Sequence, residues 1–216
     1  MAAARAAVAG YYMRALRRHG PTPAGVDWPS AVGQDLRFAM LLRLCDFAAP
    51  FTLNDVGCGY GALLDYMQRR HPTARMDYLG IDVCPAMVAC AARQWQGHPG
   101  VRFAETDEAP RVADYAIASG IFNVIPSGAA GCWSDLVAAT LSDLHRDTRR
   151  GFAVNFMGAD PSRSREPGLY RTLPAPWIAY CEQAFGAAVT LTEGYALNEF
   201  TLLVRRTKRA GWPAGT

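Results

Sequence analysis

The chain has almost no lysine: 21 of its 22 basic residues are arginines, and the formal net charge is only +3. It also lacks a stripe of basic residues interleaved with aromatics, which a nucleic-acid-binding surface would need. No apolar run approaches the roughly 18 residues that a membrane-spanning helix requires. The sequence therefore predicts a protein that has neither a nucleic acid nor a membrane as its partner.

Paired cysteines and metal-ligand clusters are missing as well. The six cysteines form no CxxC pair and no zinc spacing, which is typical of reduced thiols used as small hydrophobic residues. The first stretch, "MAAARAAVAGYYMRALRRHG", is rich in arginine but has no apolar segment of the kind found in signal peptides. We therefore expect an ordinary first helix, no metal site and a cytoplasmic location.

What the chain does have is an alternation of short apolar runs and amphipathic stretches. Strands are predicted over 52–56, 76–81, 101–104, 114–119 and 151–156, and helices over 5–18, 31–47, 61–70, 85–96, 132–146 and 174–185. Strands alternating with helices predict an α/β fold, a doubly wound parallel sheet with helices on both faces. Residues 187–206 contain two more strands with nothing helical between them, which predicts a terminal antiparallel hairpin and seven strands in all.

The predicted organisation is a helix and linker over 1–30 that cap the fold, one domain over 31–206 and a tail over 207–216. One connection fits this scheme badly. About nine residues join the strands at 101–104 and 114–119, too few for the usual crossover helix. Either that helix is a single turn or the predicted boundaries are displaced.

The stretch "TLNDVGCGYGALLDYM", residues 52–67, places three glycines within five positions behind an apolar run. Glycine in a strand-to-helix turn serves a positive φ or a ligand that lies against bare backbone. Read as GxGxxA, with Ala62 last and Asp82 20 residues further on, the turn matches the dinucleotide fingerprint. Spacing alone thus allows either a dinucleotide or an adenosyl compound.

Three features favour the adenosyl compound. Asp55, two residues before the first glycine, would repel a pyrophosphate but suits the ammonium of a methionine tail. A nicotinamide enzyme needs a further catalytic domain, for which this chain has no room. The closing hairpin is foreign to the dinucleotide-binding fold, whose strands are all parallel.

At these residues the chain resembles the class I S-adenosylmethionine-dependent methyltransferases, over about residues 31 to 206. "LNDVGCGYG" matches the first motif of the family, "YLGIDVCPAMV" the second, and "FAETD" and "DYAIASGIFNV" resemble the third and fourth. "GVDW…Q..RF" and "EFTLLVR" resemble segments of a group of small bacterial methyltransferases. The resemblance implies a Rossmann-like sheet and S-adenosylmethionine as cofactor.

The resemblance also implies roles for individual residues. Asp82 would accept hydrogen bonds from both ribose hydroxyls, and Asp107, with Thr106, would bind the exocyclic amine of adenine. The cofactor would also contact the backbone of the glycine turn, at Gly57, Gly59 and Gly61, and the backbone at the end of the fourth strand, at Ser119 and Gly120. The apolar side chains of Val83 and Met87 would pack on the faces of adenine.

Further candidates come from the edge of the sheet where the strands end. Asn123 and Asn155 either orient a substrate, as catalytic residues, or satisfy loop backbone. Arg37 is a candidate partner for the methionine carboxylate. Three arginines of one loop, Arg163, Arg165 and Arg171, indicate either an anionic group on the substrate or a solvated loop. Tyr11 and Tyr12 of the first helix either cover the pocket or belong to the core.

The sequence therefore predicts an enzyme, a methyltransferase that acts on a small molecule by in-line methyl transfer. Two alternatives stay open. The same cofactor could undergo cyclisation or elimination that releases methylthioadenosine, or the chain could bind the cofactor as a partner without turnover. The acceptor atom, the substrate and the oligomeric state leave no signature in the sequence.

Overall fold

A central sheet organises the chain in the computed structural model, which describes residues 2–160, 167–195 and 197–207. Its strand order is β3-β2-β1-β4-β5-β8-β7, and a short strand, β6, pairs with β5 outside this path. The bounds are β1 Phe51–Val56, β2 Met76–Asp82, β3 Val101–Glu105, β4 Ala113–Ala118, β5 Thr148–Gly158, β6 Arg171–Thr172, β7 Ala188–Thr192 and β8 Glu199–Arg205.

The pairing confirms the predicted architecture. Strands β1 to β5 are parallel to one another, whereas β8 runs antiparallel to both β5 and β7. The closing hairpin is therefore present, with β8 inserted between β5 and β7. Strand β6 was not predicted, because two residues are too few to show an alternating pattern.

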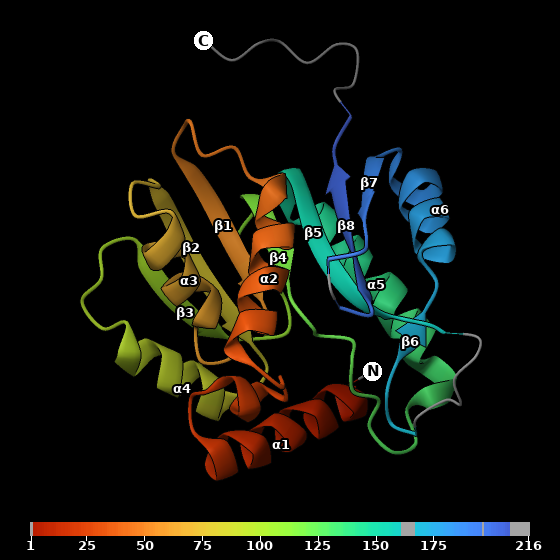
Figure 1. Ribbon diagram of the computed structural model, residues 1–216, viewed down its shortest axis with the longest axis horizontal. Helices are drawn as coiled ribbons and strands as arrows, with labels where there is room; N and C mark the ends of the chain where they lie inside the picture. The colour runs from red at the N-terminus through yellow and green to blue at the C-terminus, as the bar shows by residue number, and fades with distance from the viewer. Residues whose placement is uncertain (1, 161–166, 196, 208–216) are drawn as a thin grey trace.

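Helices cover both faces of the sheet (Figure 1). On one face α2, Ala31–Leu41, and α3, Ala62–Arg70, pack on a core that includes Leu53 and Tyr78. On the other, α5, Trp133–Arg146, and α6, Pro174–Phe185, pack on Phe152 and its neighbours. The helix predicted over 31–47 is shorter, since α2 ends at Leu41 and a 3-10 turn, η2 Leu42–Leu44, follows. Another such turn, η3 Ala130–Cys132, precedes α5.

The N-terminal helix α1, Ala2–His19, lies across the lower edge of the sheet in Figure 1. Its Tyr12 and Leu16 pack with Tyr60 and with Met87 of α4, Pro85–Gln94, while Val8 reaches the core under α5. The 3-10 turn η1, Pro23–Val26, links α1 to α2. Helix α1 thus covers the edge where the parallel strands end. Among the described residues, every helix is too short or too polar to cross a bilayer.

The connection between β3 and β4 contains no helix. Residues 106–112 form a loop, and Arg111 anchors it to the sheet. The Arg111 guanidinium donates to Oδ1 of Asn54 at 3.0 Å, to Oδ1 of Asp77 at 2.7 Å and to the carbonyl of Leu53 at 3.0 Å. One arginine therefore makes hydrogen bonds with backbone and side-chain acceptors of β1 and β2. The connection needs no crossover helix, neither a full one nor the single turn that the sequence analysis considered.

Candidate functional site

The glycine turn after β1 has the backbone conformation that its sequence requires. Gly57, Gly59 and Gly61 have φ values of +74°, +55° and +87°, in the left-handed region that favours glycine. The amides of Gly57 and Cys58 donate to the carbonyl of Ile81 at 2.8 and 3.1 Å. The turn is therefore tied to the end of β2, and Gly61 leads directly into α3.

Asp82, the last residue of β2, holds the glycine turn and the next helix together. One carboxylate oxygen accepts the amide of Gly59 at 2.9 Å and the other accepts the amide of Cys84 at 2.8 Å. Burial raises the pKa of Asp82, and these backbone hydrogen bonds oppose the rise. Each oxygen has a second lone pair, so the carboxylate can still accept a ligand's hydroxyls.

Asp55 lies near the end of β1 and is only 3% exposed. Its carboxyl accepts a hydrogen bond of 2.6 Å from the hydroxyl of Tyr78, which is fully buried. Burial raises the pKa of Asp55 to about 7, the Tyr78 hydrogen bond opposes this, and the nearby charge of Asp82 adds to it. The site therefore contains a carboxyl that titrates near neutral pH.

This pKa predicts a measurable dependence of stability on pH. Between about pH 4 and pH 7 the folded protein keeps a proton on Asp55 that the unfolded chain has released, since the ordinary value is 3.8. The folded state then binds more protons, so the free energy of unfolding falls as pH rises, by up to about 1.4 kcal/mol per pH unit. The variant Asp55→Asn should lose this contribution. Urea unfolding of both proteins from pH 4.5 to 8 measures it, and parallel curves would contradict the assignment.

The turn after β4 forms another wall of the site, beside the glycine turn after β1 and the end of β2. Gly120 has a φ of +71°, and its amide donates to Oδ1 of Asn155 at 2.7 Å. A Cβ at Gly120 would lie 2.3 Å from Cζ2 of Trp28, so this glycine allows the indole to contact the backbone. Oγ of Ser119 and Oδ1 of Asn123 are buried without a hydrogen-bond partner among the described residues. The turn thus carries two buried polar atoms whose hydrogen bonds are not made within the described residues, and one of them belongs to a residue of the cavity wall, Ser119.

Helix α1 and η1 supply the cover. Arg5 of α1 forms an ion pair with Asp107, which follows β3. The Tyr11 hydroxyl donates to Asp27 at 2.7 Å, and burial, followed by this hydrogen bond, raises the pKa of Tyr11 to about 12. These contacts hold the N-terminal segment over the edge of the sheet.

Together these elements line one end of a cavity of about 180 Å³, which continues beneath α5 from Trp133 to Asp147. Its walls include residues predicted as cofactor contacts or as cover: Tyr12, Asp55, Gly57, Gly59, Asp82, Val83, Met87, Thr106, Asp107, Ser119 and Gly120. The same walls include Val26, Trp28 and Gln34, for which the sequence suggested no role. Within the described residues, no three histidine, cysteine or acidic side chains come together as metal ligands.

Other predicted residues lie outside the cavity walls. Both ends of the Asn155 amide are engaged, with Gly120 and with Glu199, and its side chain is fully buried. Arg37 pairs with Glu199. The remaining members of this group are Gly61, Tyr11, Asn123 and Arg171, while Arg163 and Arg165 lie outside the described residues.

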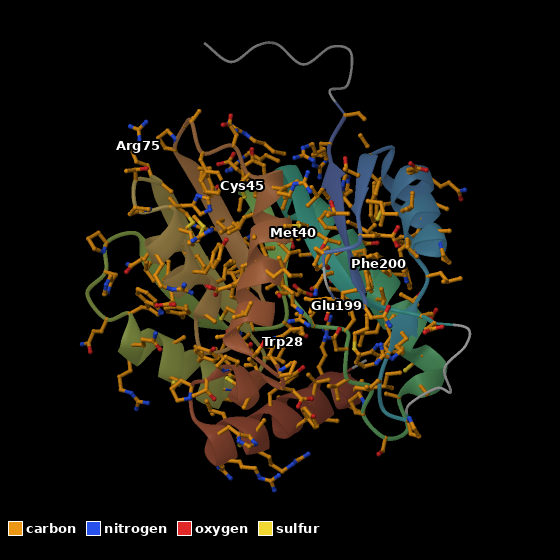
Figure 2. The ribbon with its side chains drawn as sticks, in the orientation of Figure 1. Trp28, Met40, Cys45, Arg75, Glu199 and Phe200 are labelled. Carbon is orange, nitrogen blue, oxygen red and sulfur yellow. The ribbon has the colours of Figure 1, made fainter. Side chains whose placement is uncertain are left out.

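A buried polar network beside the cavity joins two of the predicted site residues, Arg37 and Asn155, to Glu199, which the sequence analysis did not name. Nε of Arg37 donates to Glu199 at 2.7 Å, Nη2 of Arg37 contacts the other carboxylate oxygen, and Nδ2 of Asn155 donates to Glu199 at 2.9 Å. The Arg37 guanidinium lies 3.7 Å above the ring of Trp28. Figure 2 labels Trp28 and Glu199, the two residues that Arg37 contacts. The sequence did contain a signal for this network. The segments "GVDW…Q..RF" and "EFTLLVR", noted above for their resemblance to bacterial methyltransferases, contain Trp28, Arg37 and Glu199.

Comparison with known proteins gives a consistent result. Residues 54–151 match the family described as "Methyltransferase domain". The chain is 41% identical over 167 residues to "Putative methyltransferase Rv1506c" of Mycobacterium tuberculosis, across 76% of this chain and 99% of that protein. It is 37% identical over 91 residues to the trans-aconitate 2-methyltransferase of Methylobacterium nodulans, across 38% of this chain and 33% of that protein.

Among solved structures, the fold is similar to that of magnesium protoporphyrin IX methyltransferase from Synechocystis PCC 6803 with bound S-adenosylhomocysteine. The TM-score is 0.64 at 16% identity, and the match covers 94% of this chain and 97% of that one.

Proposed function

We propose that this chain, which belongs to the class I S-adenosylmethionine-dependent methyltransferases, transfers the methyl group of S-adenosylmethionine to an anionic small molecule. One observation carries the proposal. The glycine turn after β1, Asp82 at the end of β2 and the Ser119–Gly120 turn after β4 line one cavity under α1. Ligands of doubly wound sheets bind at this edge, outside the carboxyl ends of the strands.

The donor set of the cavity fits the cofactor. Asp82 offers a carboxylate for the ribose hydroxyls, and Thr106 and Asp107 offer acceptors for the adenine amine. Gly59 presents bare backbone to the cavity, and a Cβ there would lie 3.2 Å from Val26, a tight contact that the glycine avoids. We assign Val83 and Met87 to the adenine faces, and Gly57 and Gly61 to the turn that lets the cofactor approach.

The methionine end would meet the other half of the cavity. Asp55 supplies a carboxyl for the ammonium group, and the unpartnered Oγ of Ser119 lies in the neighbouring wall. Gly120 brings its backbone to the same place. This division agrees with the chemistry, since the acidic side chain faces the cationic end of the ligand.

S-adenosylmethionine supplies an electrophilic methyl group on a sulfonium with an activated leaving group. The chain's own contribution is alignment and the exclusion of water, because near-attack geometry removes much of such a barrier. Helix α1 and Trp28 cover the cavity, and the Arg5–Asp107 ion pair fastens the cover. We assign the orientation of the acceptor to Asn123, which lies outside the cavity walls but follows the Gly120 turn and has a buried Oδ1 without a hydrogen-bond partner among the described residues.

Two observations support an anionic acceptor. The trans-aconitate 2-methyltransferase relative acts, by its name, on a carboxylate anion. Arg171 in β6 lies beside the last residues of β5, where β5 ends at the same edge as the cavity. Arg163 and Arg165, which the sequence analysis named for the same role, lie outside the described residues.

Methyl transfer can be tested without knowing the acceptor. We expect purified protein, incubated with S-adenosylmethionine labelled on the methyl carbon and a metabolite extract, to form S-adenosylhomocysteine together with a labelled product. The extract is first divided on an anion exchanger, and mass spectrometry locates the label. Asp82→Asn should strongly lower the yield of product, whereas Asp65→Asn, the same change at an exposed position of α3, should leave it unchanged.

The outcomes separate the parts of the proposal. Release of methylthioadenosine in place of S-adenosylhomocysteine would contradict methyl transfer. Label found only in the neutral fraction would overturn the anionic acceptor and keep the enzyme class.

A further inference from the structure

We infer that Arg37, Glu199 and Asn155 form a positioning network that holds the Ser119–Gly120 turn in place for the aminocarboxypropyl end of S-adenosylmethionine. The inference rests on the proposed function and adds to it, since these three side chains would act through another group and not by touching the ligand. They come from α2, β8 and β5, and each is at most 8% exposed.

The first step is the orientation of the Asn155 amide. Its Nδ2 donates to Glu199 at 2.9 Å, and a carboxylate can only accept hydrogen bonds. This leaves Oδ1 facing the other way, where it accepts the amide of Gly120 at 2.7 Å. A flipped amide would place an N–H against the N–H of Gly120. The charge of Glu199 therefore decides which atom Asn155 presents to the turn.

The second step is the orientation of Glu199. Nε of Arg37 donates to one carboxylate oxygen at 2.7 Å, Nη2 contacts the other, and the first oxygen also accepts Asn155. A bidentate arginine–carboxylate pair has a defined geometry, because the guanidinium is planar. Glu199 thus has one available orientation, and it points toward Asn155.

The third step is that Arg37 also reaches the turn from the opposite side. Its guanidinium lies 3.7 Å above the ring of Trp28, and Cζ2 of that ring lies 2.3 Å from the position a Cβ would have at Gly120. Gly120 is therefore held through its amide by Asn155 and covered by Trp28. Both contacts lead back to Arg37.

Another role for Arg37 would be to bind the methionine carboxylate directly. Its Nη1 is buried without a hydrogen-bond partner among the described residues, but Arg37 does not line the cavity. The two roles differ in what removal of Glu199 does. Under direct binding it would free Arg37 and strengthen binding of the tail, whereas under positioning it weakens that binding.

Two probes separate the tail from the nucleoside. S-adenosylhomocysteine carries the aminocarboxypropyl tail, and methylthioadenosine lacks it. In calorimetry, Glu199→Gln and Asn155→Leu should each weaken binding of S-adenosylhomocysteine about tenfold, the scale of one hydrogen bond to a charged group. Both variants should bind methylthioadenosine as the wild type does. A general loss of structure would weaken both probes equally, so the difference reports the turn alone.

Thr148→Val is the matched control. Thr148 begins β5, the strand of Asn155, and its buried hydroxyl donates to the carbonyl of Leu144 at 2.9 Å, at the far edge of the sheet. We expect this variant to bind both probes normally. Should a single variant not fold, the double variant Arg37→Met/Glu199→Leu removes both charges together and serves for the same measurement.

The inference is overturned if S-adenosylhomocysteine binds the variants as tightly as, or more tightly than, the wild type, or if both probes weaken together. A wild-type protein that binds neither probe would instead overturn the proposed function itself.

Discussion

Asp82→Asn should weaken the binding of S-adenosylmethionine about a hundredfold or more. In the proposed complex the carboxylate accepts both ribose hydroxyls, and hydrogen bonds to a charged group contribute roughly 1.5 to 3 kcal/mol each. An amide offers one acceptor where the carboxylate offers two, and it has no charge. Calorimetric titration of the purified variant measures the loss.

The fold should survive this change. The amides of Gly59 and Cys84 donate to separate oxygens of Asp82, at 2.9 and 2.8 Å, and Asn retains one of these acceptors. Thermal unfolding of the variant should remain cooperative. Asp65→Asn, at an exposed position of α3, should bind the cofactor normally. Unchanged affinity of Asp82→Asn would show that the ribose does not lie at the end of β2.

Arg37→Met should lower the free energy of unfolding by about 3–5 kcal/mol, the usual cost of removing one partner from a buried ion pair. The pair is nearly inaccessible, with both side chains 5% exposed. Loss of the guanidinium leaves the Glu199 carboxylate buried with only Asn155 as a side-chain partner among the described residues. Urea unfolding at neutral pH measures this free energy.

Two comparisons make this prediction specific. The double variant Arg37→Met/Glu199→Leu should recover most of the stability, because apolar replacement of both charges removes the unpaired one. Arg69 forms ion pairs with Asp35 and Asp65 but is 48% exposed, so Arg69→Met should cost no more than about 1 kcal/mol. An equal loss for Arg37→Met and Arg69→Met would contradict the role given to burial.

The elements and part of the cavity lining could be predicted because their signals are local. Apolar runs of strand length and amphipathic stretches placed β1 to β5 and α3 to α6 within a few residues of the observed bounds. The glycine turn and Asp82 follow strands in the sequence, and parallel strands end at one edge. Their neighbourhood therefore needed no knowledge of long-range contacts.

The roles expected for Arg37 and Asn155 depended on contacts that the sequence does not display. The sequence places both residues near the edge of the sheet. In the structure each donates a hydrogen bond to Glu199, which is 162 residues from Arg37 and 44 from Asn155. The helix-free connection 106–112 is similar, since Arg111 anchors it through groups on β1 and β2. Such partners follow from strand order, which local patterns do not specify.

The sequence by itself determined the succession of strands and helices along the chain, the closing hairpin and the edge of the sheet at which a ligand would lie. These features depend on hydrophobic periodicity and turn glycines, which act over a few residues. Only the tertiary structure decided which polar side chains face the cavity and which form hydrogen bonds or ion pairs with one another instead. The physical reason is that a buried charge must find its partner wherever the fold brings one. For Arg37 that partner is Glu199 of β8, which the sheet places beside β5.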